Sequence, residues 1–343
     1  MLSNQEVLAQ SRAAVKQWGD LWEKHAKING ERYKADGHTY RDFMYKGLGK
    51  TLLCIGLAPS FERYIDIVKQ YRDNVDIAIV DKALGPALDH GIIPDMVFLS
   101  DAVVSYEDWC EPWVDKTENI TLISNITANP KWQQNWKGPV YFTVNKDNIQ
   151  TEQIYGPLSG CYDIIPASSN VGNTIVVFTT QLMAYDEYLL LGYDFTFNDN
   201  ETYYAFKESD KRYWMKHGVT IDSSGNMGYI TQNLLFTCRW LADFYKADLI
   251  PRNIKLINCS GGTILQVPIG NLERKMRHAK KRPLTDDGKK TFLDAHAVEH
   301  KIPANPEAHK QLNEALTEHK YIGEVTIKYY RPEDIAWLTQ RCA

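Results

Sequence analysis

Cysteines are few in this sequence, and none stands at metal-ligand spacing. The six cysteines occupy positions 54, 110, 161, 238, 259 and 342. None forms the CxxC pair from which zinc sites are built. Cys54, Cys238 and Cys259 lie in apolar runs, which is typical of small core residues. The pattern excludes a zinc framework, and we expect reduced thiols.

Long apolar runs and an excess of positive charge are also absent. No stretch approaches the roughly 18 apolar residues of a membrane span, and Met1–Glu6 shows no apolar signal core. These features predict a cytoplasmic protein without membrane contact. The net charge of −4 excludes a uniformly basic coat for nucleic acid. The phosphate-binding motifs GxxxxGKS/T and GxGxxG do not occur.

The composition that remains is that of a globular protein. The chain has 343 residues, of which 44% are hydrophobic and 24% charged. This length suggests roughly two domains or one enlarged domain with a large core. Aromatic residues make up 12%, with 20 Tyr and 9 Trp, and such side chains suit binding clefts as well as cores.

Short apolar strands alternate with helical patterns along most of the chain. The predicted strands are 51–55, 76–80, 95–99, 121–123, 140–142, 188–191 and 254–257. The predicted helices are 3–28, 61–71, 83–90, 171–183 and 231–245. This alternation favours an α/β fold with a mostly parallel sheet covered by helices on both faces. We expect an N-terminal helical segment at 1–48, a sheet domain at 49–272, and a basic segment with a small C-terminal α+β appendage, including a strand at 325–329, at 273–343.

The ends of the predicted strands carry polar or small residues. In parallel α/β sheets, ligands bind outside the carboxyl ends of the strands. The candidates at these ends are Gly56, Asp81, Asp101, Asp194 and Asn258. We therefore expect them to meet at one edge of the sheet.

Two predicted helices begin with turns suited to anions. Gly56 leads from a strand to Pro59 and Ser60, so free N–H groups and a helix dipole can face a phosphate. The segment 168–174 opens an apolar helix with small and amide side chains, which suit an anion or a sugar hydroxyl. The alternative interpretation of both turns is ordinary helix capping.

A third turn contains Asp194 between Tyr193 and Phe195. An aspartate at a strand end can bind a ribose hydroxyl or act as a general base. It can equally cap the turn that follows, and the sequence leaves both interpretations open.

Residues 274–282 form a basic cluster, with six Lys or Arg in nine residues. Such a cluster suits polyphosphate or nucleic acid, although charge runs are commonly solvated faces. We predict contacts to nucleic acid by the following residues: Arg274, Lys275, Arg277, Lys280, Lys281 and Arg282. A helix here, just after the strand end at Asn258, is expected to flank the crevice.

The order and spacing of these turns resemble a known family. Residues 52–101 resemble the MptE-like domain, which also occurs in motility-associated-factor glycosyltransferases. The shared features are a strand, a Gly-x-x-Pro-Ser turn and a second strand that ends in Asp81. The Gly-Ile-Ile-Pro-Asp segment at 91–95 and a third strand that ends in Asp101 follow. Residues 170–206 are similar to bacterial sialyltransferases of the same fold, and 258–262 fit the motility-factor pattern.

The resemblance implies a Rossmann-like glycosyltransferase that binds a nucleotide-sugar across the strand ends. It implies the following donor-binding residues: Gly56, Pro59, Ser60, Asp81, Gly172, Asn173, Tyr204, Asn258 and Gly261. The sialyltransferase histidine would fall near 228–229, where this sequence has none. The candidate catalytic residues are therefore Asp194, Asp101 and the nearest histidine, His217.

A weaker similarity links the chain to glycosyltransferases of T-even-like phages. It implies transfer of a sugar, for example the pentose arabinose, to hydroxymethylated cytosine in DNA, in the host cytoplasm if the chain is phage-encoded. Three alternatives stay open: a flagellin-type protein glycosyltransferase with a CMP-nonulosonate donor, a 6-hydroxymethylpterin pyrophosphokinase, and a non-catalytic nucleotide-binding protein. The single aspartate in 100–105 weakens the kinase alternative, which needs an Asp-rich metal motif. We expect no obligatory cofactor, and the need for a divalent metal stays open.

Overall fold

The computed structural model describes residues 4–147, 150–197, 204–206, 218–221, 227–261 and 264–279. All of these belong to a compact unit of residues 1–283, and residues 284–343 form a second unit. The first helix and the start of the basic cluster thus share a unit with the sheet. His217, Lys280, Lys281, Arg282 and the predicted strand at 325–329 lie outside the described residues.

The centre of the fold is an eight-stranded sheet with the strand order β10-β7-β1-β2-β3-β4-β5-β6. Every neighbouring pair in it runs parallel. The strands are β1 Thr51–Ile55, β2 Asp76–Val80, β3 Met96–Leu99, β4 Thr121–Asn125, β5 Val140–Lys146, β6 Ile164–Pro166, β7 Glu187–Leu191 and β10 Lys255–Asn258. The parallel α/β fold predicted from the sequence is confirmed.

The inner strands are buried along their whole length, because helices cover both faces. All five residues of β1 and of β2 are buried, as are all four of β3. The chain runs from β1 outward to β6 and then returns through a helix to β7, on the other side of β1. The order of the strands therefore reverses between β1 and β7, where sheets of this kind place their ligands.

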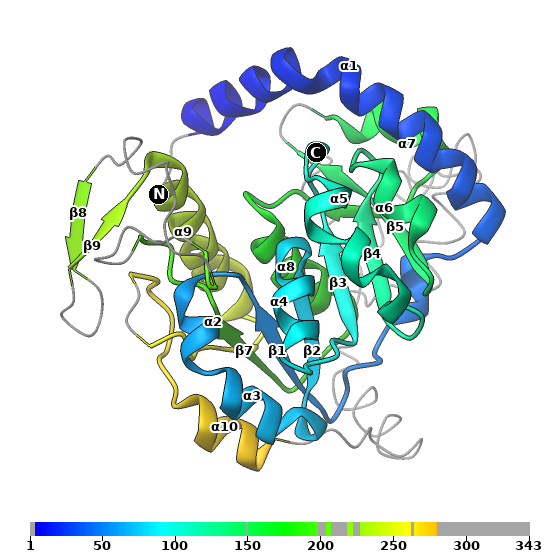
Figure 1. Cartoon of the computed structure of the whole chain (residues 1–343). Helices are drawn as coiled ribbons and strands as arrows, with labels where there is room; N and C mark the ends of the chain where they lie inside the picture. Colours follow the sequence, from blue (N-terminus) through cyan, green and yellow to red (C-terminus); the bar gives the residue numbers. More distant parts are fainter. Residues whose placement is uncertain are drawn as a thin grey trace, which may run out of the picture. The chain divides into compact units, whose positions relative to one another are not determined.

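Helices surround this sheet (Figure 1). Their bounds are α1 Asn4–Asp36, α2 Pro59–Arg63, α3 Ile65–Gln70, α4 Leu84–Asp89, α5 Tyr106–Trp109, α6 Pro130–Asn135, α7 Glu152–Ser159, α8 Val171–Leu182, α9 Gln232–Phe244 and α10 Leu272–His278. Helix α8 packs against β1, β2 and β3, and α1 packs against α6 and α7. No helix in the described ranges is long and apolar enough to cross a membrane.

Several elements differ from the sequence-based expectation. The predicted helix at 61–71 is two helices, α2 and α3, which meet at Tyr64. The short elements α5, α6, α7 and β6 were not predicted, nor was the hairpin of β8 Gly218–Ile221 and β9 Met227–Ile230. Helices of four to eight residues are too short to show a clear periodicity, and β6 ends in a proline.

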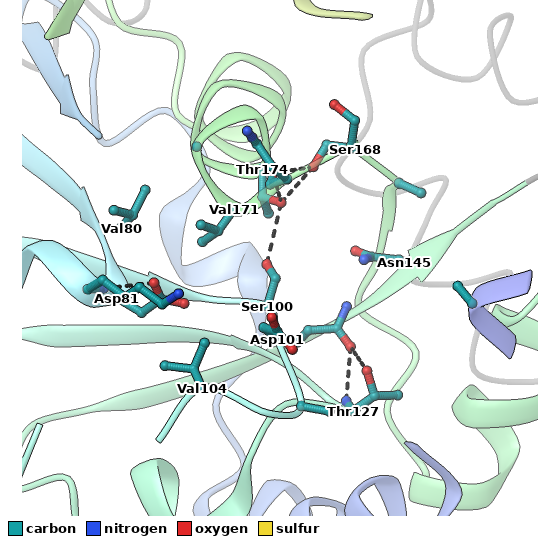
Figure 2. A pocket seen from close by; sticks show the side chains of 18 of the residues that line it. Val80, Asp81, Ser100, Asp101, Val104, Thr127, Asn145, Ser168, Val171 and Thr174 are labelled. Carbon is teal, nitrogen blue, oxygen red and sulfur yellow. Dashed lines mark hydrogen bonds between the residues drawn. The ribbon is translucent and has the colours of Figure 1, made fainter. Parts of the chain in front are cut away.

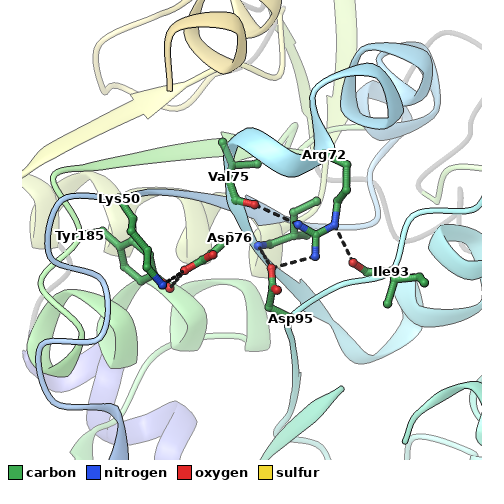
Figure 3. A network of polar contacts seen from close by, with 8 residues as sticks. Lys50, Arg72, Val75, Asp76, Ile93, Asp95 and Tyr185 are labelled. Carbon is green, nitrogen blue, oxygen red and sulfur yellow. Dashed lines mark hydrogen bonds and ion pairs between the residues drawn. The ribbon is translucent and has the colours of Figure 1, made fainter. Parts of the chain in front are cut away.

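Charged residues at the amino edge of the sheet form pairs (Figure 3). Asp76, the first residue of β2, accepts hydrogen bonds from Lys50 Nζ at 2.9 Å and from the Tyr185 hydroxyl at 2.9 Å. Asp95, just before β3, pairs with Arg72 at 2.9 Å and accepts from the backbone N–H of Ile77 at 2.7 Å. These contacts fix the starts of β2 and β3.

Candidate functional site

A cavity of about 640 Å³ lies at the carboxyl edge of the sheet. Its wall is formed by the loops after β1 to β4 and β7, the end of β5, the start of α8, and parts of α1 and α7. Its volume falls in the range of small-molecule sites, roughly 300–1,000 Å³. The predicted residues Gly56, Asp81, Asp101, Gly172 and Tyr204 all line it.

Two glycines let the ends of β1 and β7 approach each other beside the cavity. A Cβ atom on Gly56 would lie 2.3 Å from the carbonyl oxygen of Gly192, so no larger residue fits there. Gly192 has a φ of +74°, which side-chain-bearing residues rarely adopt. Both glycines line the cavity. The close approach leaves backbone, and no side chain, at the point where the strand order reverses.

Ser60 and Asp194 contact each other and do not line the cavity. Asp194 accepts the Ser60 backbone N–H at 2.9 Å and the Ser60 hydroxyl at 2.5 Å. The Ser60 hydroxyl oxygen in turn accepts the Gly192 N–H at 3.0 Å. Both residues are buried, and Pro59 occupies the first turn of α2. This geometry favours the capping interpretation of Asp194, since its carboxylate ties α2 to the end of β7.

Asp81 is the buried carboxylate of the cavity. Only 2% of its surface is exposed, and its Oδ1 atom accepts the N–H of Lys82 at 2.7 Å. Burial raises the pKa of Asp81 to about 7, a rise that the Lys82 charge opposes and the Asp101 carboxylate adds to. A carboxyl group with a pKa near neutrality can exchange protons at physiological pH.

Asp101 and Lys82 stand close to Asp81 on the cavity wall. Asp101 is exposed, and its Oδ1 atom accepts the Val103 N–H at 3.0 Å. Lys82 Nζ donates to the Tyr204 hydroxyl at 3.1 Å and lies over the rings of Trp109 and Tyr204. Burial opposes the charge on Lys82, but Tyr204, Asp81 and Asp101 outweigh it and raise the pKa of Lys82.

The start of α8 and the neighbouring strand ends supply hydroxyl groups, as Figure 2 shows. Thr174 Oγ1 lies 2.6 Å from Ser168 Oγ and 3.4 Å from Ser100 Oγ. The Asn170 side chain caps α8 by accepting the Asn173 N–H at 2.7 Å. A capped helix start with hydroxyls beside it suits an anion or a sugar.

Further along the edge, Asn145 at the end of β5 faces the cavity. Its buried Oδ1 atom has no hydrogen-bond partner among the described residues. Asn125 Oδ1, by contrast, accepts both the N–H and the hydroxyl of Thr127, at 2.9 and 2.8 Å. An unpaired buried oxygen costs free energy, which a ligand N–H or O–H group can recover.

Three predicted donor-binding residues lie outside the cavity wall and contact other parts of the fold. Asn173 donates to the Thr237 carbonyl at 3.1 Å and so joins α8 to α9. Asn258 Oδ1 accepts the Ser260 N–H at 3.0 Å, and the Ser260 hydroxyl oxygen accepts the Tyr193 N–H at 3.1 Å. Gly261 follows with a φ of +83°. Asn173, Asn258 and Gly261 are not among the residues that line the cavity.

The first helix supplies a wall that sequence reasoning missed. Ala14, Val15, Trp18 and Trp22 of α1 line the cavity. Trp22 makes an edge-to-face contact with Tyr155 of α7, with ring centroids 6.3 Å apart. The signal was present as two tryptophans four residues apart on a helix otherwise rich in polar residues. Only their position against the sheet gives them a role in the cavity.

The described part of the basic cluster lies at the opposite edge of the sheet, which corrects the expectation that it flanks the crevice. Lys275 of α10 pairs with Glu187, the first residue of β7, at 2.6 Å. Asn74, just before β2, donates to the Met276 carbonyl at 3.0 Å. The buried Leu272 and Met276 hold α10 here, and Figure 1 shows it beside α3. Arg277 pairs with Glu273, while Arg274 is exposed.

The comparisons with known proteins match this architecture. Residues 31–200 match the family described as 6-hydroxymethylpterin diphosphokinase MptE-like. The fold is similar to the structure of the MAf glycosyltransferase from Magnetospirillum magneticum AMB-1, with a TM-score of 0.55 and 16% identity. The match covers 84% of this chain and 44% of that protein, so the chain spans less than half of its length. No curated protein sequence matches the chain.

The family match confirms the resemblance to the MptE-like domain that the turns around residues 52–101 indicated, and the similar structure confirms the fold. The matched segment contains β1 to β7 and their strand ends. It excludes the first 30 residues, and with them the part of α1 that lines the cavity.

Proposed function

We propose that the chain is a glycosyltransferase that transfers a sugar from a nucleotide-sugar bound in the cavity at the carboxyl edge of the sheet. The observation that carries this proposal is the cavity itself, which combines the start of α8 with an ammonium group at Lys82. A helix start and a cation are features that bind phosphates. The similarity of the fold to a MAf glycosyltransferase supports the same class.

The reaction requires a base and a stabilised leaving group. The acceptor hydroxyl attacks the anomeric carbon, the bond from that carbon to the phosphate oxygen breaks, and the nucleotide leaves with the electron pair. The proton of the acceptor hydroxyl passes to a carboxylate. Asp81 suits this role because it lines the cavity and has a pKa raised to about 7, and Asp101 stands beside it. Asp194 has both carboxylate oxygens engaged by Ser60.

The family description also names a diphosphokinase, so pyrophosphoryl transfer is the second candidate. That reaction uses divalent metal held between carboxylates and phosphates. Within the described residues, no group of three or more His, Cys, Asp or Glu side chains is placed to hold a metal ion. Because Mg²⁺ in phosphate sites needs only one or two protein carboxylates, we rank sugar transfer first on the similarity of the fold to a MAf glycosyltransferase.

For the acceptor, we retain hydroxymethylated cytosine in DNA as the leading hypothesis. Its support is the basic cluster, which is dense for a chain with a net charge of −4. With Lys275 and Arg277 at the edge opposite to the cavity, DNA contacts there would anchor a duplex at a distance from the reacting group. A flagellin-type protein acceptor and a CMP-nonulosonate donor form the competing hypothesis.

Incubation of the protein with a panel of nucleotide-sugars and three acceptors tests whether the chain is a glycosyltransferase, a kinase or a non-catalytic protein. The acceptors are DNA with hydroxymethylcytosine, unmodified DNA, and 6-hydroxymethylpterin with ATP, each with and without EDTA. Mass spectrometry should find a sugar adduct on the modified cytosine and free nucleotide in equal amount. A pyrophosphorylated pterin formed only with magnesium would establish the kinase instead, and nucleotide binding without turnover would indicate a non-catalytic protein.

A further inference from the structure

Lys82 differs from three other half-buried cations of the sheet domain. It follows the buried Asp81 at the carboxyl end of β2 and lines the cavity. Lys50, Arg72 and Lys275, at the amino edge, each contact a carboxylate within 3 Å. Among the described residues, Lys82 Nζ contacts a phenol hydroxyl and two aromatic rings and forms no ion pair.

Aromatic side chains fix the position of this ammonium group. Nζ lies 5.7 Å from the ring centroid of Trp109 and 5.2 Å from that of Tyr204, within the range of cation–π attraction. It also donates to the Tyr204 hydroxyl at 3.1 Å. The two rings contact each other edge to face, with centroids 6.1 Å apart. Lys82 is thus held by groups that attract a cation without neutralising it.

The consequence is a charged group with unused binding capacity at the cavity wall. Tyr204, Asp81 and Asp101 outweigh the effect of burial and raise the pKa of Lys82, so its amine stays protonated at neutral pH. A lysine ammonium has three N–H donors, and the Tyr204 hydroxyl accepts one of them. The attraction between a cation and an anionic ligand is stronger when the cation is partly desolvated, because the local dielectric constant is lower.

We propose that Lys82 binds the phosphate of the donor next to the sugar and supplies the positive charge that a divalent metal supplies in other phosphate sites, with Trp109 and Tyr204 as positioning residues. The role in transfer rests on the proposed glycosyltransferase function. As the bond from the anomeric carbon to the phosphate oxygen breaks, negative charge grows on that oxygen, and the ammonium group stabilises it without giving up a proton. Loss of one such stabilising group typically lowers kcat by about 10²–10³.

The binding step can be tested without knowledge of the sugar. We would measure by calorimetry, with magnesium and in EDTA, the affinities of the full chain for nucleosides, for their diphosphates and for inorganic pyrophosphate. Lys82→Met is compared with Lys82→Arg and with Lys69→Met, an exposed lysine on α3 away from the cavity. Thermal melting of each variant checks that it is folded.

Wild type and Lys69→Met should bind the diphosphate more tightly than the nucleoside. Lys82→Met should reduce that preference at least tenfold and leave nucleoside affinity unchanged, and Lys82→Arg should restore part of it. An unchanged preference in a folded Lys82→Met variant would overturn the proposal, as would diphosphate binding by the wild type that EDTA abolishes. If the phosphate preference depends on Lys82 but no sugar is transferred to any acceptor, the binding role stands and only the proposed function fails.

Discussion

The two edges of the sheet use charged residues in opposite ways. At the amino edge, Asp76 and Asp95 each have a cationic partner and a further hydrogen bond (Figure 3). At the carboxyl edge, Asp81 and Asp101 accept only short-range backbone N–H groups in the described structure, and neither forms an ion pair there. Aspartates at the amino edge thus have cationic partners within the fold, whereas those at the carboxyl edge can still accept hydrogen bonds from a ligand.

This difference indicates where stability and activity reside. Paired charges at strand starts fix the ends of neighbouring strands, and loss of one partner lowers stability. Unpaired or partly satisfied groups, such as Asp81 and the Asn145 oxygen, lower stability and are retained at sites that bind something. Substitutions at the two edges should therefore separate the two properties.

The largest effect is expected at Asp81. Asp81→Asn keeps the size of the side chain but removes the base, so turnover should fall by about 10²–10⁴ while the protein stays folded. Asp194→Asn is the comparison, because the geometry predicts that it weakens the cap on α2 and lowers stability by about 1–3 kcal/mol. Initial rates per folded molecule decide between the two aspartates. A folded Asp194→Asn variant without activity, beside an active Asp81→Asn, would reverse the assignment.

Asp81 also predicts a pH dependence of stability. Burial raises its pKa from the ordinary 3.8 to about 7, so the folded chain keeps a proton that the unfolded chain releases between these values. Stability should fall as pH rises from about 4 to about 7, by on the order of 4 kcal/mol, and then level off. Denaturant unfolding across this range measures it. In Asp81→Asn this component should vanish, and above pH 7 the variant should be more stable than wild type.

At the amino edge, Asp76→Ala should cost stability and leave chemistry intact. It deprives Lys50 and the Tyr185 hydroxyl of their acceptor, and hydrogen bonds to charged groups contribute about 1.5–3 kcal/mol each. Urea unfolding should show a loss of at least about 2 kcal/mol, with the KM for the donor unchanged at a temperature where the variant is folded. A selective loss of donor affinity would show that the two edges are coupled.

The smallest effect is expected on α10. Lys275→Ala removes a partly exposed pair with Glu187 and should cost about 1 kcal/mol or less. Donor turnover should not change. If the cluster binds DNA, replacing Arg274, Lys275 and Arg277 together should flatten the log–log salt dependence of DNA binding by roughly three units. An unchanged slope would identify this part of the cluster as a solvated face.

Most of the fold could be predicted from the sequence, because buried parallel strands appear in it as short runs of apolar residues. The runs at 51–55, 76–80 and 188–191 became β1, β2 and β7 almost residue for residue. The β6 strand and the helices α5 to α7 were not readable, since a three-residue strand and helices of four to eight residues are stabilised by tertiary packing more than by their own pattern.

The sequence by itself also determined that Gly56, Asp81 and Asp101 share one edge, since every parallel strand directs its carboxyl end the same way. Only the tertiary structure decided which polar groups face the cavity there. Asp81 and Asp194 both follow apolar strands. Ser60 donates a hydrogen bond to Asp194, whereas Asp81 lines the cavity. Long-range packing also placed Trp18 over the cavity and α10 at the far edge. Such contacts join residues more than 80 positions apart, a distance over which local sequence patterns carry no information.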